Sequence, residues 1–188
     1  ELVSAKVMID ELDTLEKTSE SSNVKTRSET FGANTYHGVT KDANDAAGVI
    51  RYAAQSGKEI TSVYMEMLIM DAFFKDIKDS VSLTAVSGDT LTPLAFDFTK
   101  CNIVNDNGSY SVYRYKLFCD SLPINTDAVI ITLDPNGKNY TNYTAIIDKV
   151  YVFNDVYTTG DANGDGVLNI LDFVYLKKTA AEAADKKI

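Results

Sequence analysis

The chain has 188 residues, 45% of them hydrophobic and 24% charged, and its formal net charge is −9. This composition is typical of a folded globular protein and excludes a wholly disordered chain. The acidic balance argues against a nucleic-acid partner, because contacts to phosphates require clustered Lys and Arg. No apolar run approaches the roughly 18 residues that a membrane-spanning helix needs, so we expect no membrane span.

The N-terminal part has the weakest patterns. Residues 3–12 can form a strand, residues 14–29 are polar and predict a long loop, and residues 42–52 suggest a short helical turn. The sequence opens on Glu1 with neither an initiator Met nor a signal-like apolar run. We therefore expect a mature or trimmed product.

Residues 60–70 give the clearest pattern in the chain. Every second residue from Val63 to Ile69 is apolar, and this period of two predicts a strand that is buried mainly on one side. A helix is the alternative, since Met, Leu and Glu favour helices. In a strand, Tyr64 and Glu66 would share the opposite face.

Further strands are predicted at residues 81–86, 94–104, 110–118, 128–133 and 145–153. The Asn-Asp-Asn-Gly sequence at 105–108 indicates a hairpin turn, because Asn-Gly tolerates positive φ. After this turn, Tyr113 and Tyr115 would share one face, and Arg114 would lie on the other. The spacing of about ten residues predicts an antiparallel β-sandwich.

Two cysteines, Cys101 and Cys119, flank this predicted hairpin. They could form one disulfide in an exported protein, and the sequence leaves their state open. The turn is off-centre between them, so we do not expect them to lie directly opposite each other. With His37 as the single histidine, the chain cannot build a closed Cys/His zinc site by itself.

A change of composition at residues 158–160 divides the chain into residues 1–154, the predicted sandwich, and residues 155–188. Residues 170–178 then predict an amphipathic helix. Its apolar positions are Ile170, Phe173, Val174 and Leu176.

Residues 161–172 match a twelve-residue calcium loop, in which Gly166 supplies the sharp turn. The predicted ligands are the side chains of Asp161, Asn163, Asp165, Asn169 and Asp172 and the backbone carbonyl of Val167. A flexible shell of hard oxygens suits Ca²⁺, whereas Mg²⁺ demands a tighter octahedral geometry. The alternative is an acidic turn that precedes an amphipathic helix.

The same stretch, from Gly160 to Lys178, resembles a dockerin repeat, and Asp172 at the last position of the loop fits dockerins better than ordinary EF-hands. The resemblance implies a cohesin partner and a cellulosome-like, polysaccharide-degrading system, on a secreted or cell-surface protein of an anaerobic bacterium. It also implies cohesin contacts at Ile170, Leu171, Lys177 and Lys178.

Dockerins normally carry two such repeats, and this chain has one, which ends at Ile188. Either the chain is truncated, or the single repeat is a local, structural calcium clip. A lone loop and helix buries too little apolar area to be stable alone. We therefore expect it to dock on the sandwich or on a missing partner.

Residues 121–152 resemble the end of a jelly-roll, galactose-binding-like carbohydrate-binding module. This implies a jelly-roll sandwich and a glycan ligand. The predicted ligand-binding residues are Tyr64, Glu66 and Tyr113 on strands and Tyr140 and Tyr143 in a loop, with Tyr36, His37 and Asn142 as further loop candidates. The alternative is that the tyrosines are core or cross-strand residues, and the absence of Trp weighs against sugar. Such modules also hold calcium between their first and last strands, which would nominate Asp10, Glu11 or Asp148.

No nucleophile elbow, phosphate loop or zinc motif occurs in the sequence, so we expect a binding protein without catalytic residues. Two alternatives remain. One is a surface adhesion or structural domain that binds protein. The other is a small glycan-active enzyme, because 27 acidic residues offer many carboxylate pairs.

Overall fold

The computed structural model describes residues 6–42, 46–56, 58–133 and 145–155. These residues form a mainly β fold of antiparallel sheets with one short helix, which confirms the predicted class. The elements are β1 (Lys6–Asp10), β2 (Glu20–Ser22), β3 (Val24–Phe31), β4 (Asn34–Lys41), β5 (Gly48–Ala53), β6 (Glu59–Met70), η1 (Asp71–Phe73), α1 (Phe74–Lys78), β7 (Val81–Ser87), β8 (Thr90–Leu94), β9 (Asp97–Asp106), β10 (Ser111–Cys119), β11 (Ala128–Leu133) and β12 (Ala145–Asp155). No helix in this part of the chain is long and apolar enough to cross a membrane.

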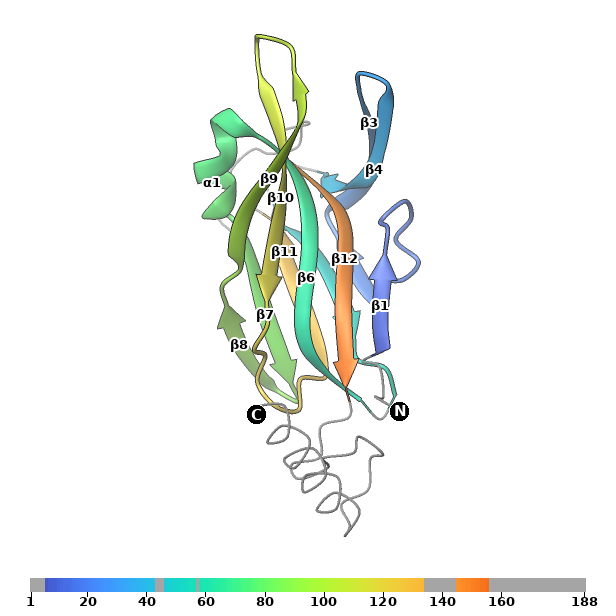
Figure 1. The fold of residues 1–188 in the computed structure, drawn as a ribbon. Coiled ribbons are helices and arrows are strands. Elements are labelled where there is room, and N and C mark those ends of the chain that lie inside the picture. Colours follow the sequence, from blue (N-terminus) through green and yellow to red (C-terminus); the bar gives the residue numbers. More distant parts are fainter. Residues whose placement is uncertain (1–5, 43–45, 57, 134–144, 156–188) are drawn as a thin grey trace, which may run out of the picture.

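The strands form two sheets that lie one behind the other (Figure 1). The larger sheet has seven strands in the order β3-β4-β12-β6-β10-β9, with β1 also paired to β12. The smaller sheet has the order β2-β5-β11-β7-β8. Since β12 pairs with β1, β4 and β6, it is the most connected strand of the larger sheet.

A single apolar core lies between the sheets. The larger sheet contributes Met65 and Val150, and the smaller contributes Ile50, Leu83 and Ile131, all of them less than 1% exposed. The contribution of β6 to this core follows from its period of two, because the odd-numbered residues from Val63 to Ile69 all point into the core and are buried. This confirms a strand at 60–70 and excludes the helix alternative.

The hairpin of β3 and β4 approaches the sheet closely where it meets β12. Only one residue pair joins β4 to β12, Val39 opposite Ile147. The neighbouring Gly38 is buried, and a Cβ at this position would meet the carbonyl oxygen of Ile147 and lie 2.6 Å from Cγ2 of Ile146. Glycine is therefore required here by the close approach of two backbones.

Several sequence predictions about the first half of the chain are wrong. The predicted loop at 14–29 contains β2 and most of β3, and the predicted helical turn at 42–52 contains most of β5. The polar composition of β3 has a physical reason: most of its side chains are exposed or only half-buried, so alternation is not required. The predicted strand at 94–104 is in fact divided, because β8 ends at Leu94 and β9 begins at Asp97.

Both cysteines are free. In the β9–β10 hairpin, Asp97 lies opposite Phe118, and Lys100 lies opposite Tyr115, so Cys101 and Cys119 occupy different levels of the hairpin. The predicted offset between them is confirmed. Burial raises the pKa of the Cys119 thiol, a shift that favours the protonated form.

Candidate functional site

The outward side of the seven-stranded sheet carries a row of apolar and aromatic side chains. The strand registers place Ile9 opposite Tyr151, Tyr151 opposite Tyr64, and Tyr64 opposite Phe118. These four residues, which we call the aromatic row, cross four adjacent strands. They are on the outward face because the residues before and after them along each strand, such as Val63 and Met65, belong to the core, and successive side chains of a strand point to opposite faces.

The rings of Tyr64 and Tyr151 form the centre of the aromatic row. Their centroids are 5.0 Å apart, and the ring planes are inclined by 64°, an edge-to-face arrangement. Ile9 is 43% exposed, and both tyrosines are half-buried. The row therefore offers a partly accessible apolar surface about 15 Å wide, given strand spacings of about 4.8 Å.

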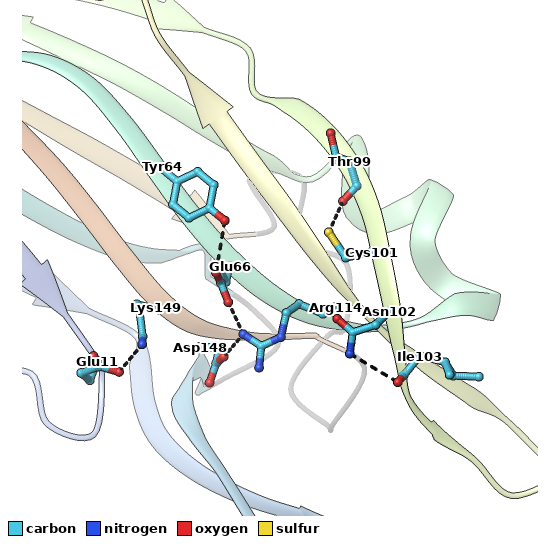
Figure 2. Close-up of polar contacts among 10 residues, drawn as sticks. All are labelled: Glu11, Tyr64, Glu66, Thr99, Cys101, Asn102, Ile103, Arg114, Asp148 and Lys149. Carbon is cyan, nitrogen blue, oxygen red and sulfur yellow. Dashed lines mark hydrogen bonds and ion pairs between the residues drawn. The ribbon is translucent and has the colours of Figure 1, made fainter.

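Three charged residues lie beside the aromatic row and form what we call the arginine cluster: Glu66 of β6, Arg114 of β10 and Asp148 of β12 (Figure 2). Nη1 of Arg114 donates to Oδ2 of Asp148 at 2.6 Å and also to Oε2 of Glu66. The Tyr64 hydroxyl donates to Oε1 of Glu66 at 3.1 Å. One hydrogen-bonded chain thus links the aromatic row to the arginine cluster.

A β-bulge places Asp148 in this cluster. Ile147 lies opposite Met67, and Lys149 lies opposite Glu66, so Asp148 is an extra residue on β12. Because a bulge redirects side chains, the strict alternation is broken, and Asp148 reaches Arg114 while Lys149 pairs with Glu11 at 2.7 Å. Both contacts are drawn in Figure 2.

The arginine cluster is largely shielded from water. The side chains of Arg114, Glu66 and Asp148 are 21%, 15% and 13% exposed. Burial raises the pKa of Asp148 despite the opposing charge and hydrogen bond of Arg114, and the nearby charge of Glu66 acts in the same direction as burial. For Arg114, burial by itself would lower the pKa, but the charges and hydrogen bonds of Asp148 and Glu66 outweigh it, and the pKa is raised.

The β3–β4 hairpin covers the far side of the arginine cluster. The Tyr36 ring lies 5.8 Å from the guanidinium carbon of Arg114, within the range of a cation–π contact. A small apolar cluster continues from there, formed by Phe31, Leu68, Val112 and Ile146, each less than 8% exposed. Along the outward face, the small apolar cluster under the β3–β4 hairpin is therefore followed by the arginine cluster and then by the partly exposed aromatic row.

Lys116 and Lys149 stand along the charged side of the aromatic row. Nζ of Lys116 is 6.0 Å from the centroid of the Tyr64 ring.

Burial raises the pKa of Tyr64, with further contributions from the charge and hydrogen bond of Glu66. The phenol of Tyr64 is therefore protonated at neutral pH and donates its hydrogen bond to Glu66.

The structure separates the predicted ligand-binding residues into two groups. Tyr64 and Glu66 lie together on the outward face, as expected for a strand. Tyr113 packs against the core on the opposite face, where Nζ of Lys100 lies 3.7 Å from its ring centroid. Tyr113 therefore does not join Tyr64 in one site, whereas the strand pairing adds Tyr151 and Phe118, which sequence reasoning missed.

The predicted calcium ligands in 161–172, the predicted cohesin contacts in 170–178, and Tyr140 and Tyr143 lie outside the described residues. Within the described ranges, no group of three His, Cys, Asp or Glu side chains is arranged to hold a metal ion. The three carboxylates nominated for a calcium site in the sandwich have separate partners: Asp10 accepts from Tyr52 at 2.9 Å, Glu11 pairs with Lys149, and Asp148 pairs with Arg114.

The signal for the missed residues was present but incomplete. The outward positions of β12 hold Tyr151 and Phe153, and an alternating pattern alone predicts that they share a face. Which strand lies next to β12 depends on pairing between segments about 90 residues apart, and the pattern within one strand does not encode it. Comparison with protein-family models and with curated proteins gave no match.

Proposed function

We propose that the chain is a secreted or cell-surface, non-catalytic binding protein of a bacterial polysaccharide-degrading system. In this proposal the sandwich is a jelly-roll that binds glycan through its outward face, and the C-terminal segment binds Ca²⁺ and a cohesin-type module. The observation that carries the glycan half is the aromatic row beside the arginine cluster. The calcium half depends on the oxygen-donor set of residues 161–172.

The arrangement of the outward face supports a glycan ligand. Sugar rings stack their apolar faces on aromatic side chains and use their hydroxyls with nearby polar groups. Tyr64 and Tyr151 provide the rings, and Lys116, Lys149 and the carboxylates of the arginine cluster lie next to them. The polar groups of that cluster are held by one guanidinium, so the surface is ordered before a ligand arrives.

Tyr151→Ala is expected to weaken glycan binding about tenfold, because an aromatic contact worth about 1.4 kcal/mol is lost. Tyr151 is preferred to Tyr64 because Tyr64 also holds Glu66. A glycan array screen of the full chain identifies the ligand, and affinity is then measured by calorimetry. Phe73→Ala is the matched control, since Phe73 is an aromatic residue of η1 that is 42% exposed. A screen without hits, or equal affinity in all three proteins, contradicts the glycan half.

A protein ligand on the same face is the second candidate. Val7 and Ile9 of β1 are 38% and 43% exposed, and aliphatic side chains of this kind favour contact with protein over sugar. Val7 lies opposite Phe153, next to the aromatic row. If glycans do not bind and Ile9→Ser reduces capture of a defined protein partner, the adhesion alternative replaces the glycan proposal.

Asp161→Ala is expected to weaken Ca²⁺ binding at least about tenfold, because it removes the first carboxylate of the predicted loop. Calorimetric titration of the full chain with Ca²⁺ measures the effect. The control is Asp89→Ala, which removes an exposed carboxylate from the turn between β7 and β8. The dockerin-like proposal is wrong if the unmodified chain binds no Ca²⁺.

A further inference from the structure

A groove lies at the end of the sandwich where β12 finishes. Its volume is about 230 Å³, and it is lined by residues 59–61, at the start of β6, and by residues 120–124, which follow β10. Ile124 is 76% exposed, the highest exposure among the large hydrophobic residues in the described ranges. With Leu122 and Pro123 it gives the groove an apolar lining.

Hydrogen bonds fix the shape of this groove. The Leu122 amide donates to the Thr61 carbonyl at 3.2 Å, and the Ile60 amide donates to the Thr126 carbonyl at 2.9 Å. The Asn125 amide also donates to the Glu59 carboxylate. Because the connection after β10 is tied to β6 on both sides of Ile124, the groove exists before anything binds in it.

The last described strand, β12, ends next to this groove. Asp155, the last residue of β12, lies opposite Glu59, which is also a lining residue. The described part of the chain therefore ends beside the groove. The 18 residues from Asp155 to Phe173 can extend to about 60 Å, so reach does not limit contact.

The predicted helix at 170–178 has an apolar side suited to this groove. At about 100° per residue, Phe173 and Leu176 lie about 160° away from Leu171 and Lys178, respectively. The side with Phe173 and Leu176 is thus turned away from Leu171 and Lys178, whereas Ile170 and Lys177 lie within about 60° of Phe173. The groove lining includes two acidic residues, Glu59 and Asp120, which complement the basic side chain of Lys177.

We propose that this groove is the docking site of the chain's own C-terminal segment, with Phe173 and Leu176 packed against Leu122 and Ile124. The docked segment covers Ile124, which is otherwise exposed to water. It also supplies the apolar area that a single calcium loop and helix lack. A cohesin-type partner would then meet a segment that is already held at a fixed position on the sandwich.

Amide hydrogen exchange of the full chain tests the docking. In the unmodified protein we expect protection of residues 170–178, and in Ile124→Asp we expect their exchange to be at least about tenfold faster. Phe173→Asp should in turn accelerate exchange in residues 120–125. Ile103→Asp is the matched control, because Ile103 of β9 is 45% exposed and lies far from the groove. Ile103 lies opposite Tyr113, which lies opposite Ile69, and Ile69 is about 30 Å along β6 from the groove.

Protection of β6 amides in each variant shows that the sandwich remains folded. The docking proposal is overturned if residues 170–178 exchange at the same rate in the unmodified protein and in Ile124→Asp, whether fast or slow. It is also overturned if Ile103→Asp has the same effect as Ile124→Asp. A calorimetric Ca²⁺ titration of the same proteins measures calcium binding independently of amide hydrogen exchange. Failure of the docking proposal can therefore be distinguished from failure of the calcium proposal.

Discussion

Replacing Arg114 with methionine is expected to lower the free energy of unfolding by about 3 kcal/mol at neutral pH. The substitution leaves Glu66 and Asp148 close together, largely buried and without their shared cation. We expect the lower end of the range for broken buried ion pairs, because the three side chains keep 13–21% of their exposure. Urea unfolding followed by circular dichroism measures the change.

This loss should diminish as the pH falls. In the native protein burial already raises the pKa of Asp148, and the charge and hydrogen bond of Arg114 oppose that rise. Without Arg114 the pKa rises further. A carboxyl group with a raised pKa contributes stability that is complete below its unfolded pKa, about 3.9, and is lost as the pH rises through the folded pKa. Unfolding curves between pH 4 and pH 8 should therefore converge with those of the native protein at the acidic end.

Two further variants distinguish the loss of stability caused by breaking the arginine cluster from the general effect of removing a surface charge. Lys149→Met breaks the pair with Glu11, whose side chain is 55% exposed, and should cost less than about 1 kcal/mol. The combination of Arg114→Met, Glu66→Gln and Asp148→Asn removes all three charges and should recover most of the lost stability. A cost below about 0.5 kcal/mol for Arg114→Met at pH 7 would show that the cluster is not a buried ion network.

Gly38→Ala is expected to destabilise the protein by about 3 kcal/mol, the upper part of the range for overpacking. The added Cβ would collide with the Ile147 carbonyl oxygen and lie 2.6 Å from Cγ2 of Ile146, and the backbone of β12 cannot move away without disturbing β6. The β3–β4 hairpin must therefore lift, which also withdraws Tyr36 from Arg114. Urea unfolding and faster amide exchange in β3 and β4 report this.

Gly88→Ala is the matched control for Gly38→Ala. Gly88 has φ of +57°, and a Cβ there would meet no heavy atom within 4 Å. The cost is then only the left-handed backbone conformation, about 1 kcal/mol. If both variants lose the same stability, close approach to β12 is not what requires glycine at position 38.

The sequence predicted the strands whose two faces differ in environment. In β6 and β10 one face is core and the other carries charged side chains between aromatic and apolar ones, so Met65 and Tyr115 alternate with Glu66 and Arg114 in a pattern that is easy to recognise. The hairpin predicted from Asn-Asp-Asn-Gly was also correct, but its turn lies at residues 107–110 and not at 105–108. Gly108 in this turn has φ of +78°. Local chemistry was enough for these elements.

The β3–β4 hairpin escaped prediction because its pattern does not come from the main core. Phe31 and Tyr36 pack on the outward face of the seven-stranded sheet, and most of β3 is exposed or half-buried. Its two-residue turn contains Gly32 with φ of +60°, a hairpin signal that polar neighbours concealed. In β5, by contrast, the alternation of Ile50 and Tyr52 was available and was misinterpreted.

The candidate site was only half predictable for a similar reason. Tyr64 and Glu66 follow from alternation within β6, but Tyr151 joins them through pairing between β6 and β12. Asp148 faces Arg114 only because a bulge interrupts β12. Bulge position and strand neighbours depend on contacts distant in sequence, which a single-strand pattern does not contain.

The place of β12 in the larger sheet also bears on how the chain folds. This strand is the last one described, yet it joins β1, β4 and β6, so the sheet has no continuous hydrogen-bonded path until residues 145–155 are available. During synthesis, the edges of β4 and β6 that pair with β12 stay unpaired until residues 145–155 have been made. Closure over more than 100 residues carries a large loop entropy, so folding of the larger sheet should be slow.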